Sequence, residues 1–245
     1  MKGRPTYGQY CPLSMAAEIL CNRWTMLVLR ELLEGSAGFN EISRGVPLMS
    51  RTLLMGRLRD LEAVGLVIRE DHGAGKPVYY RLTAAGSALG KVVRTMAEWG
   101  QEWIDVEPSV QDVDTDFLMW DIRRNVRVLP EFPSRFVVRF HFPDAPEKKQ
   151  EHWLIFESGE VDVCYIDPGY DVDVQIEANL KTMTKIWMGW QDFSTALRCG
   201  DLQIEGPRRF TTSASTWLGL SSLANVRKQP PDRRVMRSAA TTASH

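Results

Sequence analysis

Hydrophobic residues recur at helical intervals in one stretch of the first half of the chain. Leu54, Leu58 and Leu61 follow one another at spacings of four and three, which is the spacing of a single buried helical stripe. Ser50 is suited to begin this helix, because its hydroxyl can accept hydrogen bonds from the backbone N–H groups of the first turn. Gly65 is suited to end it. The pattern predicts an amphipathic helix between Ser50 and Gly65.

The opposite face of this helix is polar and contains short and cationic side chains. Its members are Ser50, Arg51, Thr52, Met55 and Arg59. Hydroxyl and guanidinium groups can contact base edges in the major groove of DNA, so this face is a candidate DNA-reading surface. Taken alone, the segment also fits an ordinary amphipathic surface helix, and the segments around it decide between the two interpretations.

Three further helices are predicted before it, of which the first is a short helix over residues 13–20. Residues 23–33 are almost wholly apolar, with charges spaced to one side, which indicates a helix in the centre of a small domain. Residues 38–45 form a helix of about two turns, and Pro47 separates it from the helix that begins at Ser50. Two short helices joined by a tight turn, the second with a polar face, are typical of a helix-turn-helix.

A β-hairpin is predicted directly after Gly65. Residues 67–71 and 78–82 are both β-prone, and the intervening residues 72–77 contain the glycine and proline that turns require. A helix-turn-helix followed by such a hairpin is the winged-helix arrangement, in which the second helix enters the major groove and the hairpin tip approaches the phosphates or the minor groove. Four polar residues are candidates for that second kind of contact: Asn40, Arg44, His72 and Lys76.

A final helix of the first domain is predicted from Ala84 to about Ile104, with Thr83 as its N-cap. Such a long terminal helix is suited to dimerisation. Its large apolar residues alternate at spacings of three and four, as in a short heptad seam: Leu89, Val92, Met96, Trp99 and Trp103. The seam packs against another helix, either within the same chain or in a second copy. We favour a homodimer, because helix-turn-helix proteins commonly read two-fold operators as dimers.

Five segments stand in a characteristic order over residues 8–106. They are the Cys11-Pro12 pair and residues 23–32 (RWTMLVLREL), 38–42 (GFNEI), 58–66 (LRDLEAVGL) and 79–86 (YYRLTAAG). This set strongly resembles the HxlR-type winged-helix transcription regulators. The resemblance implies a dimeric DNA-binding regulator whose recognition helix begins at Ser50 and whose dimer is built from the terminal helices of the domain.

The same resemblance raises a second kind of regulation. Some members of that family sense oxidants or electrophiles through the cysteine of the Cys-Pro pair, which here is Cys11. A thiol near the N-terminal end of a helix can be reactive because its pKa is lowered there, whereas a cysteine in an apolar helix environment is usually inert packing. Both alternatives stay open for Cys11.

Charge is distributed unevenly along the 245 residues, although the net charge is only -1. Residues 1–106 contain 13 Lys and Arg against 11 Asp and Glu, whereas residues 107–228 contain 14 against 19. The first part is therefore slightly basic and the second acidic, so we expect nucleic acid to meet the first part. The length leaves room for two modest domains.

Neither catalytic nor metal-binding patterns occur in the sequence. The four cysteines have no CxxC spacing, the four histidines form no zinc pattern, and no GxSxG, P-loop or GxGxxG motif is present. We therefore expect no enzyme activity, no cofactor and no metal ion. No apolar run approaches the ~20 residues that span a bilayer, and the N-terminus lacks the apolar region of a signal peptide. We expect a cytoplasmic protein without membrane insertion.

The second half of the chain changes its hydrophobic period. We interpret the acidic residues 107–114 as a linker and residues 115–228 as an α+β domain, in which a mostly antiparallel sheet is covered by helices on one face. Strands are predicted over residues 135–142, 152–156, 161–166, 171–177 and 201–206. Helices are predicted over residues 114–126, 179–188, 193–199 and 207–220. Residues 229–245 have little to bury, which indicates a disordered tail.

An alternating strand before a helix pair, and the glycine-bracketed strand 200–206 before a closing helix, resemble the sterol-carrier-protein-type lipid-binding domain. The resemblance spans about residues 115–225 and implies an apolar small molecule or lipid held between sheet and helices. The residues expected to line this pocket are Phe136, Val138, Phe140, Trp153, Ile155, Leu180, Met183, Trp187, Trp190, Phe193 and Leu197. The alternative is that they form the ordinary core of an α+β domain.

The sequence therefore predicts a dimeric regulator that binds a double-stranded DNA operator and whose affinity is tuned by an apolar ligand in the second domain. One alternative is a thiol-based regulator that acts through Cys11. Another is a lipid-carrier protein that uses its winged helix only for dimerisation. Salt-dependent, sequence-selective DNA binding separates this last class from a regulator.

Overall fold

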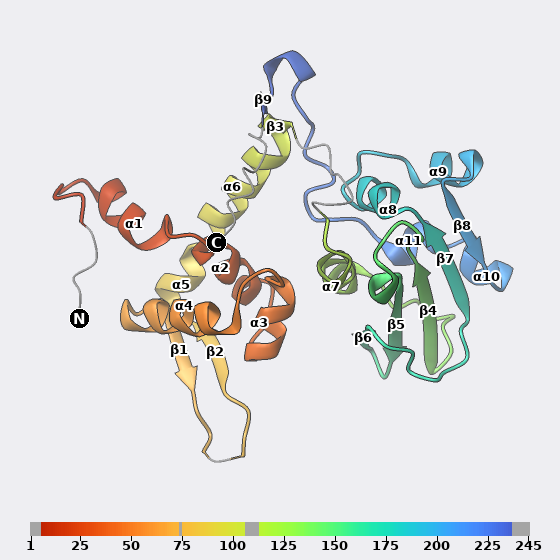
Figure 1. Ribbon diagram of the computed structural model, residues 1–245, viewed down its shortest axis with the longest axis horizontal. Helices are drawn as coiled ribbons and strands as arrows, with labels where there is room; N and C mark the ends of the chain where they lie inside the picture. Colours follow the sequence, from red (N-terminus) through yellow and green to blue (C-terminus); the bar gives the residue numbers. More distant parts are fainter. Residues whose placement is uncertain (1–5, 74, 106–112, 237–245) are drawn as a thin grey trace. The chain divides into compact units, whose positions relative to one another are not determined.

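The structure, a computed structural model, describes residues 6–73, 75–105 and 113–236 (Figure 1). The chain divides into two compact units, Met1–Met96 (unit 1) and Ala97–His245 (unit 2). Almost all of the predicted linker lies outside the described residues, as do the last residues of the predicted tail, 237–245.

Unit 1 is a winged helix. Its helices are α1 (Pro12–Leu20), α2 (Thr25–Leu33), α3 (Phe39–Gly45), α4 (Arg51–Ala63), α5 (Ala84–Ala88) and the first part of α6 (Gly90–Trp103). Strands β1 (Val67–Glu70) and β2 (Tyr79–Leu82) pair antiparallel, with Val67 opposite Leu82 and Glu70 opposite Tyr79. The helix-turn-helix and the hairpin predicted from the sequence are confirmed.

Helix α4 follows its sequence signals closely. The Ser50 hydroxyl accepts a hydrogen bond from the Leu53 N–H (3.3 Å) and caps the helix. Leu54, Leu58 and Leu61 are at most 1% exposed and lie in the core of unit 1. Because this stripe is buried, the opposite face of α4 is turned toward solvent.

A buried carboxylate ties α2 to the end of α3. Glu31 is fully buried and accepts hydrogen bonds from the Arg30 guanidinium (Nη2 to Oε1, 2.8 Å) and from the Ser36 hydroxyl (3.4 Å). Arg30 Nη2 also donates to the Gly45 carbonyl (2.8 Å). A Cβ atom on Gly45 would overlap the Glu31 carboxylate, so any larger residue where α3 ends requires this buried carboxylate to move.

The single helix expected over residues 84–104 is divided into α5 and α6. Thr83 caps α5 as predicted, because its hydroxyl accepts a hydrogen bond from the Gly86 N–H (3.1 Å). Gly86 is buried against the Leu66 carbonyl, where a Cβ atom would overlap the oxygen. These contacts hold α5 against the residues that directly follow α4. Leu89, placed in the dimer seam by the sequence, is partly buried and packs against the core of unit 1.

The boundary between the two units falls inside α6, before the domain end expected at residue 106. The last turns of α6 belong to unit 2, and they make polar contacts there. The Gln101 side-chain amide donates to the Met188 carbonyl (3.4 Å), and the Gln229 N–H donates to the Glu102 carbonyl (2.9 Å). Both contacts are polar, so the sequence contains no hydrophobic pattern that predicts this boundary.

Within the described residues, unit 2 contains a five-stranded mixed sheet. Its strands are β4 (Arg135–His141), β5 (Glu151–Glu157), β6 (Glu160–Cys164), β7 (Val174–Ala178) and β8 (Leu202–Glu205), in the spatial order β6-β5-β4-β7-β8. Neighbouring strands are antiparallel except β4 and β7, which are parallel. The expectation of a mostly antiparallel sheet omits this pair. After β6 the chain crosses to the far side of β4, and β7 runs there in the same direction as β4.

The helices of unit 2 are α7 (Thr115–Asn125), α8 (Leu180–Trp187), α9 (Phe193–Cys199), α10 (Arg208–Thr211) and α11 (Ala214–Leu218), with 3-10 turns at Glu147–Lys149 and Pro231–Arg233. The closing helix expected over residues 207–220 is divided into α10 and α11. The Ser213 hydroxyl donates to the Arg209 and Phe210 carbonyls (3.1 and 3.3 Å). Such side-chain bonds slightly destabilise and often bend a helix, and the division between α10 and α11 falls at Thr212 and Ser213.

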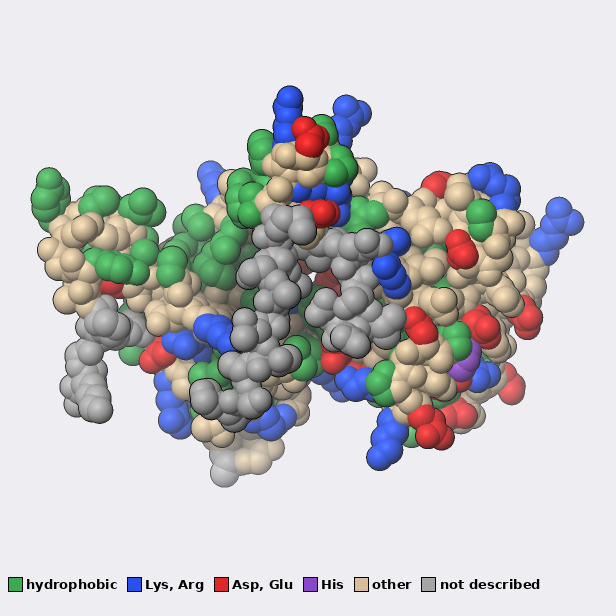
Figure 2. Space-filling model, turned by 45° about the horizontal axis from the view of Figure 1, so that its top comes forward, with side chains coloured by type: hydrophobic (Ala, Val, Ile, Leu, Met, Phe, Trp, Pro, Cys, Tyr) green, Lys and Arg blue, Asp and Glu red, His purple; other side chains and the backbone are tan. Residues whose placement is uncertain are grey.

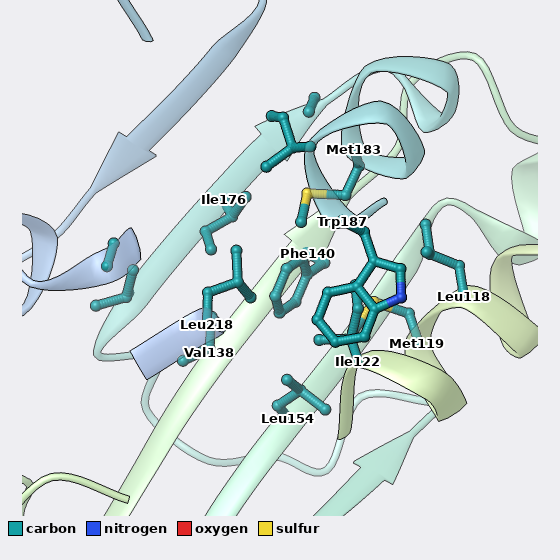
Figure 3. Close-up of a cluster of buried hydrophobic side chains, with 14 of the residues drawn as sticks. Leu118, Met119, Ile122, Val138, Phe140, Leu154, Ile176, Met183, Trp187 and Leu218 are labelled. Atoms are coloured by element: carbon teal, nitrogen blue, oxygen red, sulfur yellow. The ribbon is translucent and has the colours of Figure 1, made fainter. Parts of the chain in front are cut away.

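One face of the sheet is covered by α7, α8 and α11 (Figure 3). Buried side chains from these elements meet in one cluster, which includes Leu118, Met119, Ile122, Val138, Phe140, Leu154, Ile176, Met183, Trp187 and Leu218. The Trp187 indole N–H donates to the Asp121 carboxylate (2.8 Å), so the polar atom of this large buried side chain has a partner. Apolar burial therefore holds the helices on the sheet.

The residues predicted to line an apolar pocket do not all lie together. Those in the core cluster or packed against it are Phe136, Val138, Phe140, Leu180, Met183, Trp187 and Phe193. Side chains alternate between the two faces of a strand. Trp153 pairs with Arg139, so it lies on the face opposite to the core cluster, and Ile155 lies there with it. Leu197 is 38% exposed on α9, and Trp190 lines a separate surface cavity.

Residues 229–236 of the predicted disordered tail adopt regular structure. Strand β9 (Val235–Met236) pairs parallel with β3 (Ile104–Asp105). The Arg234 guanidinium donates to the Asp105 carboxylate (3.2 Å). Backbone and charged hydrogen bonds therefore anchor a segment that has few apolar side chains. The composition of this segment indicates disorder because it reflects the scarcity of apolar side chains and contains no information on these polar contacts.

Candidate nucleic-acid interface

The exposed face of α4 and the hairpin line one concave surface of unit 1. This cavity, of about 880 Å³, is bounded by the start of α3, by α4 and by β1 and β2. Four of the residues singled out from the sequence line it: Asn40, Arg51, Met55 and Arg59. The structure thus brings together side chains from two segments that the sequence assigns to different kinds of DNA contact.

Arg51 is held in place by α3. Its guanidinium donates to the Asn40 side-chain oxygen (Nη2 to Oδ1, 3.0 Å) and lies over the Phe39 ring, 4.7 Å from the ring centroid. Nothing in the sequence singles out Phe39, since one aromatic residue at a helix start is an ordinary feature of a core. An exposed guanidinium that is already oriented loses less freedom when it binds a ligand.

The hairpin is bonded to the loop before α3. The Tyr80 N–H donates to the Ala37 carbonyl (2.8 Å), and Tyr79 forms a β-bridge with Gly38. The buried Tyr80 side chain also reaches α4, where its hydroxyl donates to the Met55 sulfur (3.8 Å). Sequence reasoning misses this role of Tyr80. The hairpin and the exposed face of α4 are therefore parts of one packed structure.

Charges of both signs line the cavity. Among the described side chains, the cationic ones are Arg51, Arg59 and Arg69, and the anionic ones are Glu41 and Glu62. The Glu41 carboxylate accepts hydrogen bonds from the Ala37 and Gly38 N–H groups (2.9 and 3.0 Å), so it serves to start α3. Arg51 and Arg59 are exposed and are suited to face a polyanion.

The third cation, Arg69, is partly neutralised at the hairpin loop. Its guanidinium donates to the Asp71 carboxylate (2.7 Å). The pKa of the Asp71 carboxyl lies below its usual value, first because the Gly73 N–H donates to it (3.0 Å) and then because Arg69 does. Asp71 is therefore ionised at neutral pH, and it offsets the charge of Arg69.

The other candidates for DNA contact do not line the cavity. The Ser50 hydroxyl is engaged as the cap of α4, and Thr52 is exposed on the first turn of that helix. Arg44 is exposed on α3. His72 and Lys76 are exposed in the hairpin loop. All five are accessible from solvent.

Helix α6 exposes one apolar face, which contains three of the residues predicted for a dimer seam. Val92, Met96 and Trp99 are 47%, 59% and 49% exposed, and their spacings of four and three place them on one side of the helix. Trp103 is half-buried. Figure 2 shows exposed hydrophobic side chains over α6 and, separately, over α1. Contiguous exposed apolar side chains are typical of a protein–protein contact.

Cys11 occupies the N-cap position of α1, directly before Pro12. Its side chain is exposed, and its carbonyl accepts hydrogen bonds from the Met15 N–H (3.1 Å) and the Ser14 hydroxyl (2.8 Å). Of the two interpretations from the sequence, burial in apolar packing does not describe this cysteine.

Among the described residues, no group of three or more His, Cys, Asp and Glu side chains is arranged to hold a metal ion. In the same part of the chain, no helix combines the length and apolar character needed to cross a membrane.

A helix-turn-helix, a paired wing and an exposed cationic helix face define the class of DNA-binding winged-helix proteins. Residues 19–108 match the family described as HxlR-like helix-turn-helix. The chain is 38% identical over 107 residues to the uncharacterized HTH-type transcriptional regulator YvaP of Bacillus subtilis, and this match covers 42% of the chain and 96% of the relative. It is 35% identical over 101 residues to the regulator sll1512 of Synechocystis sp., with 41% and 75% covered.

Among solved structures, the redox regulator HypR in its reduced form is 33% identical, with 37% of this chain and 91% of HypR covered and a TM-score of 0.36. The chain belongs to the HxlR-like helix-turn-helix family of transcriptional regulators, and the family predicted from the sequence is confirmed. The family match ends at residue 108. The role of unit 2 is therefore inferred from its own residues.

Proposed function

We propose that this regulator binds a two-fold DNA operator as a homodimer, with the exposed face of α4 in the major groove and the hairpin beside the DNA backbone. The observation that carries the proposal is the cavity of unit 1, in which Arg51, Met55 and Arg59 share one concave surface with the hairpin. The major groove admits one α-helix, and a guanidinium bound to guanine is its commonest specific contact.

Different side chains are assigned to different parts of the DNA. Those assigned to base edges and the groove wall are Ser50, Arg51, Thr52, Met55 and Arg59. Those assigned to phosphates or the minor groove are Arg44, His72 and Lys76. Asn40 is assigned as a positioning residue, because its oxygen holds the Arg51 guanidinium. Phosphate contacts set the register on the duplex, and base contacts supply the specificity.

Replacing Arg51 with alanine is expected to weaken binding to the preferred operator by about 1–3 kcal/mol, because a bidentate contact to guanine is lost. Binding to random DNA of the same length is expected to fall much less. The preferred operator is selected from a random library. Affinities are then measured by fluorescence anisotropy at fixed salt, since phosphate contacts make them salt-dependent.

Arg44→Ala is the matched control for this measurement. It is expected to weaken binding to the operator and to random DNA by the same factor, and to reduce the dependence of affinity on salt. Equal losses on both DNAs for Arg51→Ala would assign Arg51 to a phosphate. If the full chain showed no salt-dependent, sequence-selective binding, the proposal would fail and the lipid-carrier alternative would replace it.

We also propose that unit 2 is an effector domain that alters the fit of the dimer to its operator. A ligand regulates only by binding the two dimer geometries with different affinity. An apolar ligand between the sheet and the helices, as the sterol-carrier resemblance implies, has to displace packed side chains such as Met183 and Trp187, both at most 2% exposed. The close packing of unit 2 therefore supports the proposal of an apolar ligand less strongly than the cavity of unit 1 supports the proposal of DNA binding.

A second candidate mode of regulation, thiol oxidation, is favoured by the exposed Cys11 side chain at the start of α1. The test compares operator affinity before and after diamide treatment for the unchanged chain and for Cys11→Ser. An affinity change confined to the unchanged chain supports a thiol switch. The same response in both proteins contradicts it.

A further inference from the structure

A second cavity lies in unit 2, after the end of α8, and has a volume of about 780 Å³. It is formed where residues 189–191 and residues 224–228 meet. Gly189 adopts a left-handed conformation (φ 71°), and a Cβ atom there would be forced against the Ala224 carbonyl. The Ser221 N–H donates to the Trp187 carbonyl (2.9 Å) close by. The two segments are therefore fixed walls of this cavity.

The lining is cationic, although residues 107–228 carry more acidic than basic side chains. Among the described residues, the charged side chains of the lining are Lys185, Arg227, Lys228, Arg234 and Asp105. The Asp105 carboxylate accepts a hydrogen bond from Arg234 (3.2 Å), so it neutralises one of these cations. Arg227 and Lys228 add further positive charge to the lining, which favours an anion in the cavity.

Trp190 adds a donor to this lining. Its indole Nε1 is buried and has no hydrogen-bond partner among the described residues. The Lys228 ammonium lies over the indole ring, with Nζ 3.7 Å from the ring centroid. A buried N–H group without an acceptor costs free energy, and a ligand that accepts its hydrogen bond recovers this cost.

Lys228 is partly desolvated in the same place. Burial lowers the pKa of its ammonium group, and the charge of Arg234 lowers it further, against the opposing effect of Asp105. A bound anion counteracts both causes, because it supplies an opposite charge at short range. The cationic lining of the cavity and the lowered pKa of Lys228 therefore both favour an anionic ligand.

We infer that this cavity is a binding site for a small anion with a carboxylate or phosphate group, held by Arg227, Lys228 and the Trp190 indole N–H. The site differs from the apolar space between sheet and helices in both place and chemistry. Arg234 directly precedes β9, which pairs with β3 at the end of α6. Asp105 of β3, directly after α6, also lines the cavity, so a bound anion lies beside the end of the helix that carries the seam, and its effect on operator binding rests on the proposed function.

The test titrates the full chain with inorganic phosphate and, separately, with succinate, at constant ionic strength. Fluorotryptophan is incorporated, and the fluorine NMR signal of Trp190 is identified by its loss in Trp190→Phe. A saturable shift of that signal is expected with at least one anion. Saturation by phosphate alone or by succinate alone identifies the group that the site takes. The inference is overturned by a signal that does not saturate with either anion.

Lys228→Met keeps an apolar side chain over the indole and removes the charge, so it is expected to weaken anion binding about tenfold. Lys148→Met is the matched control, because Lys148 is an exposed lysine of the same unit that does not line the cavity. It is expected to bind like the unchanged chain. Unchanged affinity in Lys228→Met would mean that these cations only stabilise the end of α8, and would overturn the inference.

Operator binding by the same preparations keeps this inference separate from the proposed function. A chain that binds the operator but neither anion contradicts the anion site alone. A chain that binds phosphate at Trp190 but no DNA contradicts the proposed function alone.

Discussion

Replacing Gly45 with alanine is expected to lower the free energy of unfolding of unit 1 by about 3 kcal/mol, because overpacking and the disturbance of a buried ion pair both have costs of this order. The added Cβ atom would take the place of the Glu31 carboxylate. That carboxylate cannot move aside without losing its hydrogen bonds to Arg30 and Ser36. Chemical denaturation followed by circular dichroism measures the change.

Gly56→Ala is the matched control, since it makes the same substitution in α4. A Cβ atom on Gly56 meets no atom within 4 Å. Alanine is a better helix former than glycine, so the free energy of unfolding is expected to rise by about 0.5–1 kcal/mol. The two substitutions should therefore have opposite signs. A Gly45→Ala protein as stable as the unchanged chain would contradict the fixed position of Glu31.

Replacing Met96 with glutamate is expected to convert the proposed dimer into a monomer. Met96 is the most exposed residue of the seam on α6, at 59%. A dimer that packs this seam against its copy would bury two unpaired carboxylates, which is costly. Sedimentation velocity measures the mass. Binding to DNA with two half-sites is expected to weaken about 100-fold, because the second contact is no longer intramolecular.

Arg94→Glu controls for the added negative charge. Arg94 is exposed on α6, and the heptad spacing places it on the side of the helix away from the seam. It is expected to remain dimeric. Binding of Met96→Glu to a single half-site should match that of the unchanged chain. A Met96→Glu protein that keeps the mass of a dimer would show that the two copies meet elsewhere.

How much of the fold the sequence predicts depends on how local each signal is. Helix α4 is predicted well because its cap, its leucine stripe and its terminal glycine lie within one segment. Phe39 and Tyr80 escape prediction, because their contacts with Arg51 and Met55 join residues that are distant along the chain. No pattern within either segment indicates such a contact. The candidate base-reading residues follow from α4 alone, whereas the groups that position them do not.

The predicted apolar pocket shows a second limit. Alternation of hydrophobic residues identifies a strand but not its register, and a shift of one residue exchanges the two faces. Trp153 and Phe136 are both aromatic residues of strands. The pairing of Trp153 with Arg139 nevertheless places it on the face opposite to Phe136. Cavity lining can be distinguished from core only when side chains from several elements are seen packed together.

The bonds between the hairpin and the loop before α3 have a consequence for the DNA. Because Tyr80 is hydrogen-bonded to Ala37 and Tyr79 is bridged to Gly38, the separation between the hairpin and the helix proposed to enter the groove is set within the protein. In the proposed complex, such a fixed surface leaves any adjustment of groove width to the duplex. Base steps that bend easily, such as TA and CA/TG, are then favoured where no side chain touches the bases. The sequence preference of the regulator would extend beyond the bases that α4 contacts.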